Sequence, residues 1–272
     1  MPTPASTAAH PASPAWQPDT LVELTGGEWL TPPPQSPVHG AAIDTRALKP
    51  GQAFFAFKGE RVDGHDYAQH AAQAGAPLII AERKVAARTN TAVLRVPDVR
   101  AALAAIAAEH RKHLKGKVIA VTGSNGKTTT TRLLHAALRA RLSGTCSIKS
   151  FNNDLGLPLT LLNAAADDDF VICEAGTSGP GEIERLSAIC TPDIAVITAV
   201  GRAHLEKLGS LEGVAREKAS LAADIKEVYA EAKSFGYDTK VLRKVISLRK
   251  QDRHEREEQE ALLELYLGAV GE

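Results

Sequence analysis

The sequence VIAVTGSNGKTTT, residues 118–130, decides the fold at the centre of this chain. Its first four residues are apolar and predict a short buried strand, residues 123–126 predict a tight loop, and Lys127 to Thr131 predict the first turn of a helix. A strand, a glycine-containing loop and a helix N-terminus in this order direct backbone N–H groups at one point, where they can bind phosphate. The stretch therefore predicts a phosphate-binding loop in an α/β domain.

The side chains of this loop suit a nucleotide that is bound together with a metal ion. Lys127 can place a positive charge on terminal phosphates, and the Thr128 hydroxyl can bind Mg²⁺. The loop is shorter than the usual GxxxxGK[ST] pattern, because Val121 occupies the position of the first glycine. The alternative is an ordinary glycine-containing turn with a solvated lysine. The residues predicted to bind the nucleotide phosphates are Gly123, Ser124, Asn125, Gly126, Lys127, Thr128 and Thr129.

Composition narrows the class of protein. The chain has 272 residues with 32 basic and 32 acidic side chains, so its net charge indicates no particular partner. Its three cysteines lack metal-binding spacing and are odd in number, which favours a reducing, cytoplasmic compartment. No apolar run reaches the roughly 18 residues that a membrane helix needs. Residues 1–20 lack the basic start and apolar core of a secretory signal and predict a disordered leader.

Alternating strand and helix patterns predict two α/β domains. Residues 21–114 form the first, a small domain that contains a strand at PLIIAER and ends with an alanine-rich helix from 100 to 114. Residues 115–218 form the second, in which strands at 118–122, 170–174 and 193–198 and a helix at 127–141 indicate a parallel sheet buried on both faces. We expect this second, phosphate-loop domain to be truncated.

Polar residues follow the predicted strands of the second domain. Glu174 ends one strand, and His204 follows shortly after another. Ligands of parallel sheets bind beyond the carboxyl ends of the strands, so these two side chains and Thr128 should converge on one edge. A carboxylate, an imidazole and a loop threonine suit a magnesium–nucleotide site. Taken singly, Glu174 or His204 would be structural or solvated about as often as functional.

Several motifs in order resemble the Mur ligase family, and specifically its MurF type. They are GSNGKTTT, FNNDLGLPLTLL at 151–162, CEAGTSGPGEI at 173–183, AHLEKLGSLEGVAREK at 203–218, and IDTRALKPGQAFFAFKGERVDGHDY at 43–67. The resemblance covers about residues 21–218. It implies a ligase of peptidoglycan precursor synthesis that uses ATP to join D-Ala-D-Ala to a UDP-MurNAc-tripeptide through an acyl phosphate. It also implies that the first domain binds the UDP-sugar.

The resemblance assigns roles to individual residues. The catalytic residues would be Lys127, Lys218 and His204, and the Mg²⁺ ligands Thr128, Glu174, His204 and Lys218. Lys218 matches a lysine that the family carbamylates, and the positions near the UDP-sugar match Thr45, Arg46, Asn152 and Asn153. The segment TAVGRAHLE departs from the expected TNVGPAHLE at Ala199 and Arg202, which puts the local geometry there in doubt.

Residues 217–271 resemble a second family, the GapR-like nucleoid proteins, which form helical oligomers around DNA. Residues 226–250 hold seven basic and three acidic residues, whereas residues 251–272 hold two and seven. Such segregated charge can bind phosphate, although solvated faces of a coiled coil are the alternative. The resemblance implies an all-α module at 216–272 that forms homo-oligomers and binds duplex DNA. The matching positions are Lys218, Lys226, Lys233, Lys240, Arg243 and Lys250.

The full chain is therefore predicted to be an α/β ligase part followed by a helical module. The residues after Lys218 do not resemble the remainder of a complete ligase, so we expect no net ligation. The alternatives are a sequence-nonspecific DNA-binding protein that carries an inactive ligase fragment, and a hybrid with neither activity.

Overall fold

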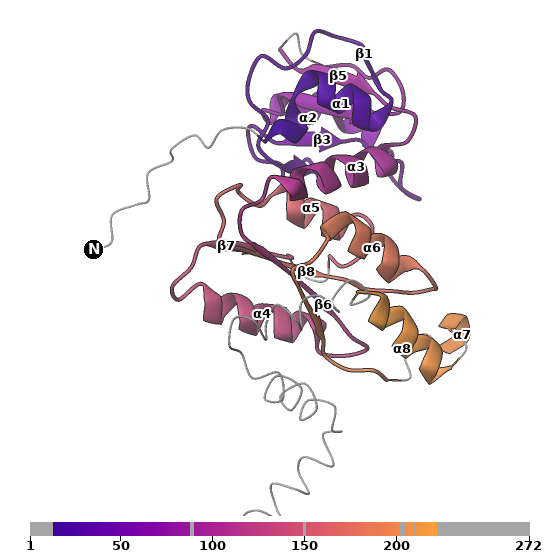
Figure 1. The fold of residues 1–272 in the computed structure, drawn as a ribbon. Coiled ribbons are helices and arrows are strands. Elements are labelled where there is room, and N and C mark those ends of the chain that lie inside the picture. The colour runs from indigo at the N-terminus through magenta and orange to yellow at the C-terminus, as the bar shows by residue number, and fades with distance from the viewer. Residues whose placement is uncertain (1–12, 88–89, 149–150, 202–204, 209, 222–272) are drawn as a thin grey trace, which may run out of the picture.

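A computed structural model describes residues 13–87, 90–148, 151–201, 205–208 and 210–221. These residues form two α/β units, one above the other in Figure 1, and the phosphate-loop stretch lies in the lower unit. No helix in the described part of the chain is long and apolar enough to cross a membrane.

The first unit is a five-stranded sheet with helices around it. Its central strands are apolar and completely buried, as expected of parallel strands that are covered on both faces. The first strand is antiparallel to its neighbour, and the other pairs are parallel. In sheet order the strands are β1 (Glu28–Trp29), β5 (Ala92–Arg95), β4 (Leu78–Ala81), β3 (Ala53–Phe55) and β2 (Ala41–Ala42). The helical segments are η1 (Pro14–Trp16), α1 (Pro18–Thr25), η2 (Gly64–Tyr67), α2 (Ala68–Gln73) and α3 (Val99–Lys112).

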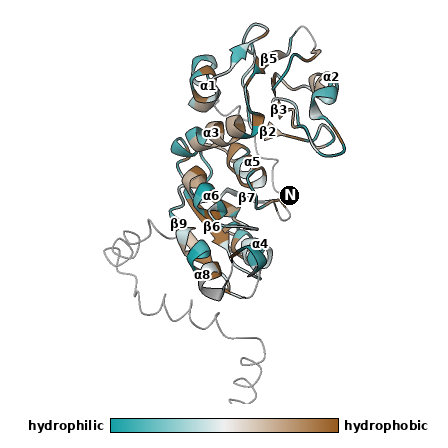
Figure 2. Ribbon diagram, turned by 90° about the vertical axis from the view of Figure 1, so that its right-hand side faces the viewer, coloured by the Kyte–Doolittle hydropathy of each residue, from teal (hydrophilic) through white to brown (hydrophobic). Residues whose placement is uncertain are grey.

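The second unit is a four-stranded parallel sheet, and Figure 2 shows β6 as a hydrophobic strand at its centre. In sheet order the strands are β7 (Gly144–Cys146), β8 (Phe170–Glu174), β6 (Lys117–Thr122) and β9 (Ile194–Ile197). Helix α4 (Lys127–Leu138) covers one face, and α5 (Gly156–Leu162) and α6 (Glu182–Cys190) cover the other (Figure 1). Helix α7 (Leu205–Leu208) precedes α8 (Leu211–Ala219), which packs on α6.

The two units share one hydrophobic core, because α3 of the first packs on α5 and α6 of the second. Asn163, just after α5, adds polar contacts across the join. Its side-chain oxygen accepts a hydrogen bond from the backbone N–H of Ala41 at 3.2 Å, and its amide nitrogen donates to the Ala41 carbonyl at 2.8 Å. Arg111 of α3 pairs with Asp193 before β9 at 2.8 Å. The first unit is thus held against the sheet that carries the phosphate loop.

The predicted strands at 118–122, 170–174 and 193–198 and the helix that follows Gly126 are confirmed as β6, β8, β9 and α4. The helix ends at Leu138, three residues before the predicted end. Strands β1, β5 and β7 were not predicted. The sequence Gly144–Cys146 in particular carries little apolar signal.

A disordered leader was predicted for residues 1–20, and the structure contradicts the last part of this prediction. Residues 13–20 form η1 and the start of α1, and Trp16 is only 4% exposed within the shared core. Burial of an indole stabilises structure in an otherwise Pro-, Ser- and Ala-rich segment. Residues 1–12 lie outside the described residues.

Candidate phosphate-binding site

The loop of residues 123–126 connects β6 to α4 and is held by the segment after β9. The Ser124 backbone N–H donates to the Ala199 carbonyl at 2.9 Å, and the Gly201 N–H donates to the Ser124 hydroxyl oxygen at 2.9 Å. The Thr198 hydroxyl donates to the Asn125 carbonyl. Gly123 has a φ of +154°, and a Cβ atom there would collide with the Thr198 side chain. The loop is therefore fixed from outside and requires glycine at its first position.

The N-terminus of α4 is available to an anion. Its N-cap is Gly126, with φ +82°, which has no side chain to accept hydrogen bonds from the first turn. N–H groups without an intrahelical partner and the helix dipole both favour negative charge at this point. Lys127 is half-buried beside it and donates from Nζ to the Gly123 carbonyl at 2.7 Å, and burial lowers the pKa of this amine. Lys127 is therefore folded back onto the loop whose bound phosphates it is predicted to contact.

Glu174 stands at the end of β8 with no exposed surface. Its Oε2 accepts a hydrogen bond from the Thr128 hydroxyl at 3.2 Å, so two predicted Mg²⁺ ligands are in contact. Burial raises the pKa of this carboxyl, while the Thr128 hydrogen bond and the Lys127 charge oppose that rise. Asn152 is close enough to favour the ionised form, yet Oε1 has no hydrogen-bond partner of normal geometry in the described part of the chain.

The unpartnered Oε1 of Glu174 is suited to bind a divalent cation. A buried carboxylate oxygen without a partner costs free energy, and a hard divalent cation would satisfy it. The described residues contain no cluster of three His, Cys, Asp or Glu side chains that could hold a metal ion by themselves. Among the described residues, Glu174 and Thr128 would be the ligands of a cation here, and a bound phosphate would supply further oxygen ligands.

Lys218 of α8 is a buried lysine at the same place. Only 2% of its surface is exposed. Burial, and next the nearby charge of Lys127, lower the pKa of its amine to about 8, and Glu217 acts in the opposite direction. A lysine with such a pKa is partly neutral near pH 8 and can act as a nucleophile. The charge of Lys127 acts on Lys218, so the two amines lie near each other, while the catalytic role of Lys218 stays a prediction.

The predicted sugar-binding residues do not gather in the same way. Thr45 and Arg46 follow β2 in the first unit, and the exposed Arg46 guanidinium pairs with Asp44 at 2.6 Å. Hydrogen bonds from Arg46 lower the pKa of Asp44 to about 2. Asn152 lies beside the end of β8, because its carbonyl accepts a hydrogen bond from the Gly176 N–H at 2.6 Å.

Asn153 has a structural function in the observed conformation. Its Oδ1 accepts hydrogen bonds from the N–H groups of Leu155 and Gly156 at 3.3 and 3.0 Å, and so caps the start of α5. His204 lies outside the described residues, and so do Lys226, Lys233, Lys240, Arg243 and Lys250.

Two residues of the site environment were not anticipated. The Ser147 hydroxyl oxygen, after β7, accepts a hydrogen bond from the Glu174 N–H at 2.9 Å, and so fixes the end of β8. Glu217 neighbours Lys218 and is buried against α6. Neither belongs to a sequence motif that indicates its contact, because both contacts depend on how distant elements pack.

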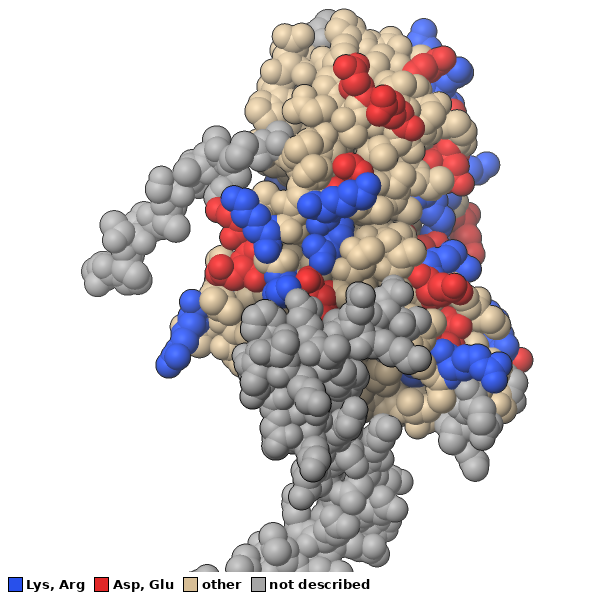
Figure 3. Space-filling view, in the orientation of Figure 1, with Lys and Arg blue, Asp and Glu red and all other residues tan. Residues whose placement is uncertain are grey.

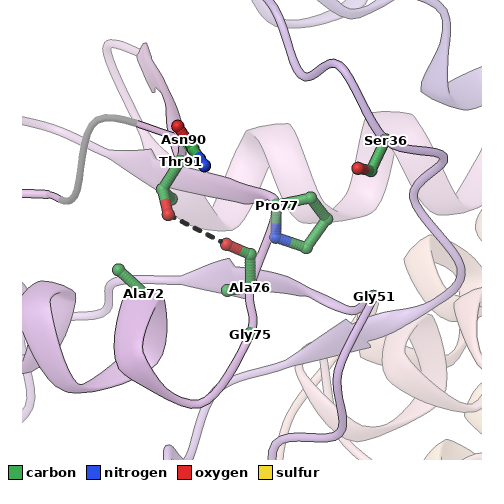
Figure 4. A pocket seen from close by; sticks show the side chains of 8 residues that line it. All are labelled: Ser36, Gly51, Ala72, Gly75, Ala76, Pro77, Asn90 and Thr91. Carbon is green, nitrogen blue, oxygen red and sulfur yellow. Dashed lines mark hydrogen bonds between the residues drawn. The ribbon is translucent and has the colours of Figure 1, made fainter.

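A separate hollow of about 650 Å³ lies in the first unit, at the amino ends of β3, β4 and β5. Gly51, Pro77 and Asn90 are among the lining residues, and Figure 4 shows Thr91 donating to the Ala76 carbonyl within it at 3.2 Å. None of its lining side chains is ionisable. The phosphate loop follows β6 in the second unit, so the hollow and the loop are distinct.

An open parallel sheet with helices on both faces and a phosphate loop after its first strand defines a class of nucleotide-binding α/β domain. Two family models identify this chain more closely. The model described as "Mur ligase family, catalytic domain" matches residues 37–111, and the "Mur ligase middle domain" matches residues 121–255. The chain belongs to the Mur ligase family. The second match continues well beyond residue 218, where the sequence analysis ended the ligase part.

Curated relatives are of the MurF type. The UDP-N-acetylmuramoyl-tripeptide–D-alanyl-D-alanine ligase of Bacillus subtilis is 40% identical over 209 residues, which is 76% of this chain and 46% of the relative. The Escherichia coli enzyme of the same name is 36% identical over 68% of this chain and 40% of its own length. The chain thus spans less than half the length of these relatives.

Solved structures agree with this assignment. MurF from Acinetobacter baumannii superposes with a TM-score of 0.66 at 35% identity, over 76% of this chain and 46% of that one. The MurF ligase from Thermotoga maritima in complex with ADP gives a TM-score of 0.58 at 35% identity, over 68% of this chain and 43% of that one. The similarity to a GapR-like module concerns residues that the structure does not describe, and it stays a prediction.

Proposed function

We propose that this chain carries the nucleotide site of a MurF-type ligase, which activates the carboxylate of a UDP-MurNAc-tripeptide with ATP and joins it to D-Ala-D-Ala. The observation that supports this proposal most is the meeting of Lys127, Thr128, Glu174 and Lys218 at one end of the parallel sheet. The 40% identity to the Bacillus subtilis ligase supports the same chemistry.

The reaction has two steps that place different demands on the protein. A carboxylate oxygen of the tripeptide attacks the γ-phosphorus of ATP, the bond to the β–γ bridging oxygen breaks, and an acyl phosphate and ADP result. The amine of D-Ala-D-Ala then attacks the acyl carbon, phosphate leaves with its electron pair, and the amine loses a proton. The α4 N-terminus and Lys127 hold the phosphates in place and stabilise the charge that develops on them.

Mg²⁺ fits the donor set of the site. Thr128 and Glu174 would hold it, and His204 is a further ligand by resemblance. When bound, the ion neutralises phosphate charge and polarises phosphoryl oxygens. Glu174 is buried, and its Oε1 has no hydrogen-bond partner of normal geometry among the described residues, so this oxygen can bind the ion.

Lys218 is proposed to act as a carbamate. Its neutral amine attacks the carbon of CO₂, an N–C bond forms, one C=O electron pair moves onto oxygen, and a proton is released to solvent. The product is a carboxylate-like group beside Lys127. A pKa of about 8 supplies the neutral amine that this step requires at physiological pH.

The sugar nucleotide is proposed to bind between the two units through Thr45, Arg46, Asn152 and Asn153. Asn152 lies at the strand end next to Glu174, so it is the member of this set that could bring a substrate towards the phosphate loop. Arg46 would have to exchange its pairing with Asp44 for the substrate.

The two steps can be tested separately on the purified full chain. With ATP, Mg²⁺ and UDP-MurNAc-tripeptide, the proposal expects ADP release and, when hydroxylamine is added, a hydroxamate formed from the acyl phosphate. Addition of D-Ala-D-Ala then tests for the UDP-MurNAc-pentapeptide by mass spectrometry. Lys127→Ala should abolish the hydroxamate. We expect no pentapeptide from either protein, because the residues after Lys218 do not resemble the remainder of a complete ligase. Release of ADP without any hydroxamate, at a rate that Lys127→Ala does not change, would contradict the proposal.

Duplex-DNA binding by residues 216–272 is a second candidate, favoured by the segregated charge of that sequence. On the face that Figure 3 shows, the described residues carry both signs of charge interspersed. Each phosphate that a lysine neutralises should add about 0.9 to the log–log salt slope of binding. Lys226→Ala and Lys233→Ala should therefore flatten that slope in fluorescence anisotropy, while Glu257→Ala should not. A slope near zero for the unaltered chain would exclude this candidate.

A further inference from the structure

Glu217 makes a set of contacts that its place in the chain does not suggest. It is 9% exposed and lies on α8 next to Lys218. Its Oε2 accepts a hydrogen bond from the Gly181 N–H at 2.8 Å, and its Oε1 accepts one from the Ile183 N–H at 2.9 Å. Thr177 adds a longer contact from its hydroxyl at 3.5 Å. One buried carboxylate therefore binds the segment that leads from β8 into α6.

These contacts replace a cap that α6 lacks. The N-cap of α6 is Gly181, at φ +74°, which has no side chain to bind the first turn. An unpaired N–H group at a buried helix end is costly, and a carboxylate is the acceptor that the helix dipole favours there. The charge of Glu217 is thus stabilised by hydrogen bonds and by the dipole, although the side chain is almost completely removed from water.

The capped segment connects two parts of the candidate site. It begins directly after Glu174 at the end of β8 and continues to the start of α6. Glu217 itself is the covalent neighbour of Lys218. Figure 1 shows α8 lying alongside α6, so the carboxylate fastens these two helices together at one point. Glu217 therefore forms a polar connection between the segment that follows Glu174 and the helix that carries Lys218.

We propose that Glu217 is a positioning residue, whose bonds to the N-terminus of α6 hold α8 so that Lys218 stays buried beside the phosphate loop. The inference rests on the proposed function for the importance of Lys218, but its geometric part can be tested without any turnover. A simple helix cap would stabilise α6 alone. A positioning residue must in addition control the accessibility and chemistry of Lys218.

The test uses pulse acetylation of the full chain with acetic anhydride in buffer depleted of CO₂, followed by peptide mass spectrometry. In the unaltered chain Lys218 should react slowly compared with Lys112, whose side chain is 69% exposed. Glu217→Gln keeps one acceptor oxygen and removes the other, so Lys218 labelling should rise at least fivefold while Lys112 labelling stays constant. Glu217→Asp retains the charge at a shorter reach and should give an intermediate rate. Glu184→Gln, at an exposed position of α6, is the matched control and should change neither lysine.

A spectroscopic measurement separates positioning from simple stability. With ¹³C-bicarbonate, the unaltered chain should show a lysine carbamate signal that Glu217→Gln loses. Circular dichroism establishes which variants are folded, and Glu217→Asp provides the readout if Glu217→Gln does not fold. A folded variant that keeps Lys218 fully protected would overturn the positioning role. Loss of protection in the variant, together with no carbamate in the unaltered chain, would keep the positioning role and contradict the proposed carbamylation.

Discussion

The two halves of the candidate site differ in how far the protein has prepared them. At the phosphate loop, Glu174 has no exposed surface, Lys218 is 2% exposed, and Thr128 already contacts Glu174. At the predicted sugar side, the Arg46 side chain is 88% exposed and paired with its neighbour Asp44. The phosphate half is assembled by the packing of four elements, whereas Arg46 is held by a contact within its own loop.

This difference indicates which interactions the fold itself imposes. Buried charged and polar groups are expensive, so they persist only where the surrounding structure compensates for them or where a ligand does. The phosphate half, with the buried Glu174 and Lys218, is therefore stronger evidence of function than the sugar half, with the exposed Arg46. Substitutions should separate the two halves, and the size of each effect should follow burial.

The largest effect is expected for Gly123→Ala. The added methyl group would collide with Thr198, whose hydroxyl bonds Thr122 and Asn125, and φ at this position is +154°. We expect a loss of about 3 kcal/mol in the free energy of unfolding and loss of ATP binding. Gly126→Ala is the comparison, because a Cβ there meets its nearest atom at 3.7 Å; only the strain of φ +82° remains, at about 1 kcal/mol. Urea unfolding measures both, and equal losses would show that the loop is not held by Thr198.

Glu174→Gln should separate binding from stability. The variant removes a charge that Mg²⁺ needs, so Mg²⁺-dependent ATP affinity should fall about tenfold. The folded chain raises the pKa of Glu174, so ionisation of this group destabilises the protein as the pH rises above about 4.5. The stability of the unaltered chain should therefore fall relative to the variant over that range. If the pH–stability curves of the two proteins are parallel, burial of the ionised Glu174 carboxylate does not destabilise the protein.

Asn153→Ala should lower stability without changing nucleotide affinity. Its Oδ1 caps α5 through two N–H groups, and loss of such a cap costs about 1 kcal/mol. Asn153→Asp, which keeps the acceptor, is the matched control and should stay close to the unaltered protein. Thermal unfolding and ATP titration of the same samples give both readouts. A tenfold change in ATP affinity would place Asn153 in the phosphate half instead.

The smallest effect on the free chain is expected for Arg46→Ala. The pair with Asp44 is exposed, and exposed ion pairs contribute little to stability. The melting temperature should therefore stay within error, and ATP affinity should not change. The affinity for the UDP-sugar, measured by calorimetry, should fall. An unchanged sugar affinity would remove Arg46 from the proposed substrate site.

The sequence predicted the parts of this molecule that depend on local pattern. The phosphate loop and strands β6, β8 and β9 are continuous stretches whose apolar residues and glycines carry the signal. Trp16 was missed because the surrounding composition resembles a disordered leader, although the indole is buried. Glu217 was missed because its partners lie 34 and 36 residues earlier in the chain and become neighbours only when α8 packs on α6.

Titration calorimetry of the full chain with ATP and Mg²⁺ tests most directly whether the phosphate half is an assembled nucleotide site. We expect one nucleotide per chain and binding that requires Mg²⁺. Lys127→Ala should weaken binding by about 2 kcal/mol or more, because a charged hydrogen bond to phosphate is lost. Lys112→Ala, an exposed lysine on α3, should bind as the unaltered chain does. ATP binding that survives unchanged in Lys127→Ala would contradict the account.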